Sequence, residues 1–202
     1  MRKIVAAVAI LVALLLFYVV WPFASLVSVV RTARAGDIAG LEQRVDWPAL
    51  RRSLAGQLVA TAARLKGIRL DRAGLTVAAV TSVIDPFIEK LTLPENISEL
   101  MRTGWPKAVL SDAPAGIEGL DPELIGNAWQ LYLNSDYGIG EVRTTVPFHR
   151  PRDQQYRVQL ALSNWTWKLS GLDLPVALQE QLARELIKSQ EKEEEKTPGH
   201  KG

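Results

Sequence analysis

Residues 4–23 form an unbroken apolar run, IVAAVAILVALLLFYVVWPF, 20 residues long and without a charged side chain. A helix of that length spans about 30 Å at about 1.5 Å per residue, which is the thickness of the hydrocarbon core of a bilayer. Tyr18 and Trp21 lie near its C-terminal end, where aromatic rings suit the membrane interface. The run therefore predicts an N-terminal transmembrane helix.

From residue 24 to about residue 103, apolar residues recur every three or four positions, the period of amphipathic helices. Asp37 and Asp46 stand where N-cap residues are expected, and Pro48 follows the second of them in a first helical turn. The Asp85-Pro86 pair interrupts one of the predicted helices, because proline disfavours helical geometry in the residue before it. The pattern predicts helices over residues 25–35 (continuing the membrane helix), 38–45, 47–65, 75–91 and 94–103.

Residues 105–126 are rich in proline and glycine, which predicts a loop. Beyond it, apolar and polar residues alternate with period two, as strands do. The spacers are short, including a predicted turn over 136–140, and so favour antiparallel hairpins. The alternation predicts four strands, over residues 129–134, 141–148, 156–163 and 165–170.

Leu178, Leu182, Leu186 and Ile187 predict a final amphipathic helix, followed by a charged tail. The expected fold class is therefore α+β: an N-terminal transmembrane helix, a helical first half packed on an antiparallel sheet of about four strands, and a C-terminal amphipathic helix. The expected units are a membrane anchor with its extension (1–35), an α+β domain (36–190) and a disordered tail (191–202).

A cleaved secretory signal is the alternative interpretation of the apolar run. Its length exceeds the roughly 7–15 residues of a typical signal core, and the small-x-small sequence Ala33-Arg34-Ala35 lies too far downstream. We therefore expect an uncleaved anchor that crosses the lipid bilayer through residues 4–23. Arg2 and Lys3 favour an N-terminus on the inner side, with the body in the periplasm of a bacterial inner membrane, although Arg31 and Arg34 equal them in number.

Composition narrows the function. The chain has 202 residues, 48% of them apolar, too many for a disordered protein. It has no cysteine, which excludes disulfides and thiolate metal sites and fits an oxidising compartment. Its 24 basic and 22 acidic residues are too evenly balanced for a nucleic-acid partner. We expect neither a metal nor another cofactor.

Candidate catalytic residues are few. His149 is the one histidine of the predicted body, and it lies beside arginines rather than beside an identifiable acid–base partner. The carboxylate pairs Asp85/Glu89, Asp121/Glu123 and Asp136/Glu141 contain residues in cap or turn settings, and no phosphate-binding loop or nucleophile elbow is present. We expect no enzyme; a hydrolase built on Asp85, Asp121 or His149 is the least favoured hypothesis.

The second half carries a local concentration of basic and aromatic residues, a candidate site for a phosphate-bearing ligand or lipid headgroups. An exposed hairpin loop of mixed charge is the simpler interpretation. Two of the tryptophans, at i and i+2, are expected to share a strand face, in the core or in a ligand pocket between helices and sheet. The candidate contacts are Arg143, Arg150, Arg152, Arg157, Trp165 and Trp167.

Two stretches resemble a bacterial family known as domain of unknown function 2939. The first comprises Ala35-Gly36-Asp37, Leu41-Glu42, the run from Val45 to Arg51 and Leu54; the second comprises Trp167-Lys168-Leu169, Leu172 and Leu174-Pro175. The resemblance would cover roughly residues 18–175. It implies a location in the bacterial envelope but no activity and no catalytic residue. The second stretch also looks like the closing strand of small cone folds of the nuclear-transport-factor-like type.

The leading hypothesis is thus a membrane-anchored protein with a non-catalytic interaction domain. The alternative is a small-molecule or lipid-binding module, with a pocket between the helices and the aromatic face of the sheet.

Overall fold

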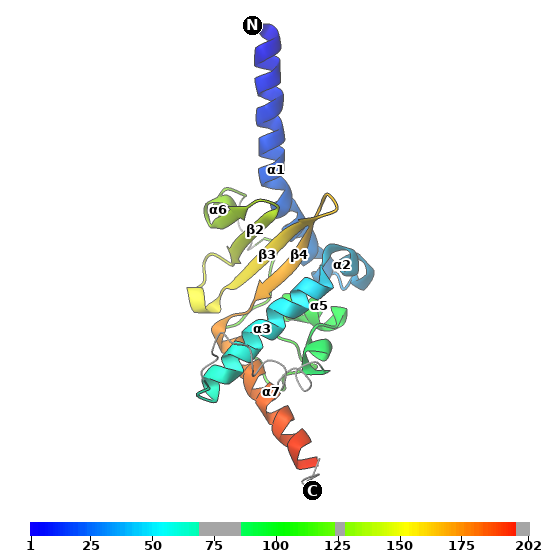
Figure 1. The fold of residues 1–202 in the computed structure, drawn as a ribbon, viewed down its shortest axis with the longest axis vertical. Helices are drawn as coiled ribbons and strands as arrows, with labels where there is room; N and C mark the ends of the chain where they lie inside the picture. The colour runs from blue at the N-terminus through cyan, green and yellow to red at the C-terminus, as the bar shows by residue number, and fades with distance from the viewer. Residues whose placement is uncertain (69–85, 124–127, 197–202) are drawn as a thin grey trace.

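The structure is a computed structural model that describes residues 1–68, 86–123 and 128–196. A long helix projects from an α+β body (Figure 1), which confirms the predicted fold class. The elements are α1 (Arg2–Arg34), α2 (Ile38–Arg44), α3 (Trp47–Leu65), α5 (Pro94–Thr103), α6 (Ala128–Leu133), β1 (Ser135–Gly138), β2 (Glu141–Val146), the 3-10 turn η1 (Arg152–Gln154), β3 (Tyr156–Ser163), β4 (Thr166–Asp173) and α7 (Val176–Lys196).

Local capping residues begin the first helices of the body. The carboxylate of Asp37 accepts a hydrogen bond from the amide of Gly40 at 2.9 Å, and that of Asp46 accepts from Ala49 at 3.1 Å. Each satisfies an amide in the first turn that has no partner within its own helix. Gly36, at φ +68°, forms the left-handed turn between α1 and α2. Both predicted N-caps are confirmed.

The sheet has the order β1-β2-β3-β4, and every neighbouring pair is antiparallel. The β1–β2 turn, at Ile139-Gly140, and the β3–β4 turn, at Asn164-Trp165, lie at the same end of the sheet because the strands alternate in direction. The β2–β3 connection, residues 147–155, lies at the opposite end. We refer to these as the hairpin end and the connection end.

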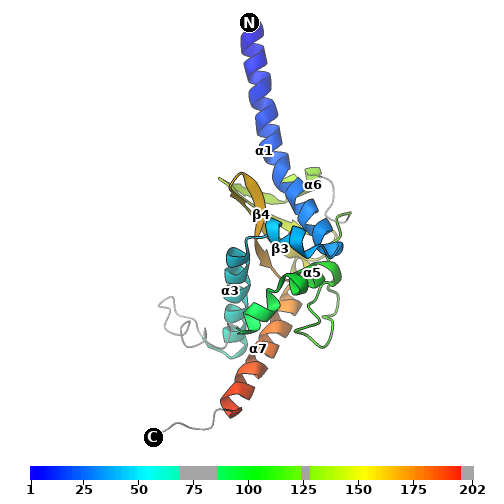
Figure 2. The same cartoon turned by 90° about the vertical axis from the view of Figure 1, so that its right-hand side faces the viewer.

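One face of the sheet is apolar and covered. Val142, Val158 and Leu160 are buried on it, whereas Arg143 and Arg157 are exposed on the other face. The second part of α1 and α5 lie over the apolar face (Figure 2). The predicted cover by helices of the first half is therefore confirmed, and it leaves the polar face of the sheet uncovered near its centre (Figure 1).

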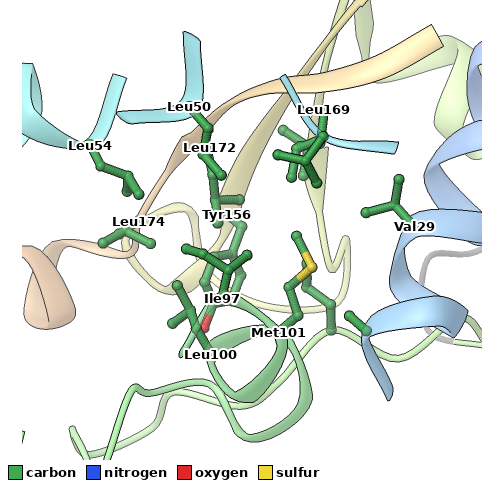
Figure 3. Close-up of a cluster of buried hydrophobic side chains, with 14 of the residues drawn as sticks. Val29, Leu50, Leu54, Ile97, Leu100, Met101, Tyr156, Leu169, Leu172 and Leu174 are labelled. Atoms are coloured by element: carbon green, nitrogen blue, oxygen red, sulfur yellow. The ribbon is translucent and has the colours of Figure 1, made fainter. Parts of the chain in front are cut away.

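Side chains from every layer meet in one core between these elements. Figure 3 shows Val29 of α1 and Leu54 of α3 converging with the α5 residue Met101 around Tyr156 and the leucines of β4. Tyr156 is 1% exposed, and its hydroxyl donates to the carbonyl oxygens of Gly104 at 3.1 Å and Glu118 at 3.2 Å. The core is thus contiguous from α1 to β4.

The predicted strand over residues 129–134 is wrong, because Ala128–Leu133 forms the helix α6. Leu131 is 2% exposed and Leu133 62% exposed, so residues two positions apart do not share a face. Two polar side chains close the helix: Asn134 donates to the carbonyl of Gln130, and the Ser135 hydroxyl donates to that of Leu131. These bonds use carbonyls that a helix end leaves free.

The first strand instead occupies part of the predicted turn over 136–140. β1 runs to Gly138, and the turn contracts to Ile139-Gly140, with Gly140 at φ +71°. Pairing of Tyr137 with Val142 extends the hairpin into residues whose composition favours a turn.

The C-terminal helix is confirmed and longer than predicted. Leu178, Leu182 and Leu186 are fully buried, and α7 packs against α3. The helix continues to Lys196, into the segment 191–202 predicted as a disordered tail, since its lysines and glutamates are good helix formers. Residues 86–91 are helical, whereas the rest of the predicted helix over 75–91, residues 124–126 of the predicted loop, and residues 197–202 lie outside the described residues.

Candidate functional site

The helix α1 consists of two parts with different surroundings. Its N-terminal part contains an 18-residue window with a mean hydropathy of 2.9, of which 0% is buried. In the described ranges it is the helix long and apolar enough to cross a bilayer, a property that signal sequences share. From Phe23 onward the helix belongs to the body: Leu26 is 1% exposed and Val29 and Val30 are fully buried.

Aromatic residues hold α1 where it meets the hairpin end of the sheet. The rings of Tyr18 and Trp167 are 5.8 Å apart, and those of Phe23 and Tyr137 are 6.1 Å apart in an edge-on arrangement. The hydroxyl of Tyr18 accepts a hydrogen bond from the amide of Gly140 at 3.2 Å. We call these four aromatic residues the collar, and it fixes the level on α1 at which the sheet begins.

Tyr137 of the collar keeps its proton over the physiological range. Burial raises its pKa to about 12, and the neighbouring Tyr132 adds to the rise. Its hydroxyl lies 3.5 Å from the carbonyl oxygen of Val19, to which it donates.

Polar contacts fasten the other end of α1 to the body. Arg34 pairs with Asp121 at 3.1 Å and also donates to the carbonyl of Leu120 at 3.2 Å. The buried hydroxyl of Ser98, on α5, donates to the carbonyl of Ala33 at 2.7 Å. The last three turns of α1 are therefore an integral part of the body.

Three of the four predicted arginines line one groove at the connection end of the sheet. Arg150, Arg152 and Arg157 lie with residues of β1, β4 and α7 around a groove of about 780 Å³. The polar members that the sequence analysis missed are Asn134, Ser135, Asp136, Thr145, Gln155, Asp173 and Gln179. Distant segments of the chain supply them, so no local pattern indicates that they meet.

The groove is polar and of mixed charge. Arg150 pairs with Glu118, and Arg157 lies 3.7 Å from Asp173, with both side chains about half exposed. Arg152 has no acidic partner among the residues that the structure describes. An exposed guanidinium without a partner is the group in the groove most readily available to an anion.

The other three predicted contacts lie elsewhere. Arg143 is on the polar face of the sheet, paired with Glu141 at 2.6 Å. Trp167 is 1% exposed in the collar, whereas Trp165 is 85% exposed. The expectation that the two tryptophans share a strand face is wrong, because Trp165 occupies the β3–β4 turn with φ +59°. The six candidates therefore do not form one site.

The position of the groove bears on its ligand. Strands of six to eight residues separate the connection end from the hairpin end, a distance of about 20–27 Å at about 3.4 Å per residue. The arginines are consequently far from the level where α1 leaves the body, which disfavours headgroups of a bilayer spanned by α1. On the side of the sheet that carries Trp167, α1 covers the core, and Trp167 also borders a polar groove of about 390 Å³ between α1, α2 and β4. This groove is the part of the predicted aromatic pocket that the described residues form.

The candidate catalytic groups do not converge in the described part of the chain. His149 is exposed and has no hydrogen bond to a carboxylate there, and Asp121 is engaged by Arg34. Asp85 lies outside the described residues. Within the described ranges, no group of three or more His, Cys, Asp or Glu side chains is arranged to hold a metal ion.

Comparison with known proteins finds one family match. Residues 11–100 match the model of a family described as a protein of unknown function (DUF2939). This confirms the resemblance from residue 11 of α1 through α2 and α3 to residue 100 of α5. The resemblance of Trp167–Pro175 lies beyond the match and stays a prediction. No curated protein and no solved structure matches the chain.

Proposed function

We propose that this chain is a single-pass protein of a bacterial inner membrane, held by an uncleaved α1, with a non-catalytic interaction domain on the periplasmic side. The family match adds no activity, since the family itself is one of unknown function.

The observation that carries this proposal is the double use of α1. The same uninterrupted helix exposes an apolar surface over its first part and buries Phe23, Leu26 and Val29 in the core of the body. Cleavage at Ala33-Arg34-Ala35 would remove these side chains and the contacts of Arg34 and uncover the apolar face of the sheet. Each fully buried apolar side chain contributes about 1.5–3 kcal/mol, so losing these three would cost about 5–9 kcal/mol, which is comparable with the whole stability of a typical domain, about 5–15 kcal/mol.

The charges beside the span support the proposed orientation. Arg2 and Lys3 directly precede it, whereas Arg31 and Arg34 follow only after the helix has entered the body. Arg34 is moreover paired with Asp121. Positive residues next to a span favour the cytoplasmic side, which leaves the body outside.

Two measurements test the anchor. Sequencing the N-terminus of the protein purified from membranes is expected to find Met1 or Arg2, and alkaline carbonate washing is expected to leave the protein in the membrane pellet. Recovery of a chain that begins near Gly36 and stays in the supernatant would refute the anchor.

Orientation is tested with single cysteines, since the chain has none of its own. Asp153→Cys, in the exposed turn η1, is expected to react with a membrane-impermeant maleimide in intact spheroplasts. A cysteine inserted between Met1 and Arg2, which keeps both basic residues, is the matched control and is expected to react only after lysis. The reverse pattern would place the body in the cytoplasm.

A second candidate function, an anion-binding module, is favoured by the groove. A volume of about 780 Å³ falls within the range of ligand sites, and Arg152 offers a guanidinium without an acidic partner. We expect inorganic phosphate to raise the unfolding temperature of the full chain in detergent, and Arg152→Gln together with Arg157→Gln to abolish the shift. Arg143→Gln, outside the groove, is the control and should preserve it. If the shift persists in the double variant, the groove is not the site.

A further inference from the structure

Each of the two turns at the hairpin end exposes one large apolar side chain and contains no charged residue. Ile139 is 106% exposed and Trp165 is 85% exposed. Neither 138–140 nor 163–166 contains a charged residue, whereas the connection at the other end contains His149, Arg150, Arg152 and Asp153. The tips of the two turns beside the collar are thus uncharged, and charged side chains begin at Glu141 and Lys168, in the strands that follow the turns.

The collar fixes the depth of these turns relative to α1. The amide of Gly140, next to Ile139, donates to the hydroxyl of Tyr18, and Trp167, two residues from Trp165, contacts the Tyr18 ring in a tilted arrangement. Both turns therefore lie near the level of Tyr18.

The length of the span places that level inside the membrane boundary. Tyr18 is 16 residues after Arg2, which is about 24 Å of helix at about 1.5 Å per residue. A hydrocarbon core of about 30 Å needs about four residues more, to Pro22. A helix that starts at its charged residues and fills the core thus carries Tyr18 to about 6 Å inside the far boundary. Tilting the helix deepens this position, because each residue then covers less of the bilayer thickness.

From these observations, and given the anchor proposed above, we propose that the β1–β2 and β3–β4 turns insert Ile139 and Trp165 into the interface of the bilayer that α1 spans. The body is then held at three points, α1 and two hairpin turns, and has a defined orientation on the membrane. Trp is suited to the role because its ring favours the level of the headgroups.

Two further features agree with this placement. Trp165 is in the left-handed region, which costs a non-glycine residue about 1–3 kcal/mol, yet it gains almost no burial in the protein. Beside the β3–β4 turn lies the polar groove of about 390 Å³ that is lined by Ser25, Ser28, Arg44 and Lys168 and by the turn residues Ser163, Asn164 and Thr166. Hydroxyl and cationic groups next to an exposed indole suit the interface, where an aromatic ring lies among headgroups.

Depth measurements on the full chain test the proposal. Single variants Ile139→Cys and Trp165→Cys are labelled with a nitroxide and reconstituted into vesicles of phosphatidylethanolamine and phosphatidylglycerol. Oxygen concentrates in the membrane and a nickel chelate in water, so their ratio of accessibilities reports depth. Val176→Cys, an exposed apolar position at the connection end, is the matched control, and Val8→Cys marks the span.

We expect the ratio at both turns to exceed that at Val176→Cys several-fold and to fall short of that at Val8→Cys. A value at either turn equal to that at Val176→Cys, with Val8→Cys embedded, overturns the insertion and leaves the anchor standing. A value for Val8→Cys that matches water overturns the anchor and the insertion with it. All four exchanged side chains are exposed, and equal unfolding temperatures in detergent would verify that the variants fold alike.

Discussion

The side-chain amide of Gln57, on α3, donates a hydrogen bond of 2.8 Å to the carbonyl oxygen of Leu172 at the edge of β4. The same amide accepts from the backbone N–H of Leu174 at 2.9 Å. Nearer the hairpin end, Asp46 donates its backbone N–H to Leu169 at 2.8 Å. α3 and the residue before it thus supply the partners that a fifth strand would otherwise give this edge, which protects it from pairing with another chain.

Replacing Gln57 by leucine is expected to lower the free energy of unfolding by about 2 kcal/mol, because it leaves a partly buried carbonyl and amide without partners. The measurement is denaturant unfolding of the full chain in detergent. Gln43→Leu, on the exposed face of α2, is the control and should change stability little. Equal stability of the two variants would mean that water replaces the amide of Gln57.

Thr144 offers a stabilising substitution. Its side chain is 1% exposed on the apolar face of the sheet, and its hydroxyl has no hydrogen-bond partner among the described residues. Valine has nearly the same shape without the polar atom, so Thr144→Val should raise the free energy of unfolding by about 1 kcal/mol. Thr145→Val, on the opposite face, is the control and should show no such gain. A loss of stability in Thr144→Val would reveal a partner for the hydroxyl.

The buried hydroxyl of Tyr156 is expected to make the folded protein less stable at alkaline pH. Burial raises the pKa of its hydroxyl above the value of about 10 that a free tyrosine has. The folded state therefore holds this proton more tightly than the unfolded chain, so its contribution is complete below pH 10 and is lost as the pH rises further. Tyr156→Phe should unfold more easily at neutral pH, since it lacks the hydrogen bonds to Gly104 and Glu118, and should lose less stability above pH 10. Identical pH profiles for the two proteins would contradict this.

The β3–β4 turn contains two residues in the left-handed region, and its stability can be measured in detergent without a bilayer. Asn164 and Trp165 have φ values of +49° and +59°, the geometry for which Asn-Gly is preferred. In detergent, Trp165→Gly should be more stable than Trp165→Ala by about 1 kcal/mol, because alanine keeps a Cβ in the left-handed region. If the alanine variant is as stable as the glycine variant, the turn relaxes when the indole is removed.

Local signals in the sequence predicted most of the helices and three of the four strands. Asp37 and Asp46 were predicted as N-caps from the residues that directly follow them. The alternation of apolar and polar residues predicted β2 and β3 correctly, because both strands are central in the sheet. The prediction of a strand over residues 129–134 was wrong because Trp129, Leu131 and Leu133 fit the period of a strand. The side chains of Asn134 and Ser135, which bond to the last carbonyls of α6, lie at or beyond the end of the alternating segment.

The candidate site was predictable only in part. Arg150, Arg152 and Arg157 were found because they are close in sequence, but Asp136, Asp173 and Gln179 join them through the pairing of strands and the start of α7. Trp165 and Trp167 were assigned to one face because residues two positions apart share a face within a strand, but Trp165 lies in the turn that precedes β4. The hydrogen bond between Gly140 and Tyr18 joins residues 122 positions apart and depends entirely on tertiary structure.

The part of α1 from Phe23 onward forms one wall of the core, so the helix that we propose crosses the membrane is continuous with the body that it would anchor. A cut before Phe23 would leave this wall in the released body, whereas a cut at Ala33-Arg34-Ala35 would remove it and open the apolar face of the sheet, so the site of the cut decides whether the fragment stays folded. Because α1 precedes the strands in the chain, this wall is already synthesised when the sheet forms, and under the proposed anchor the body completes its core beside the membrane.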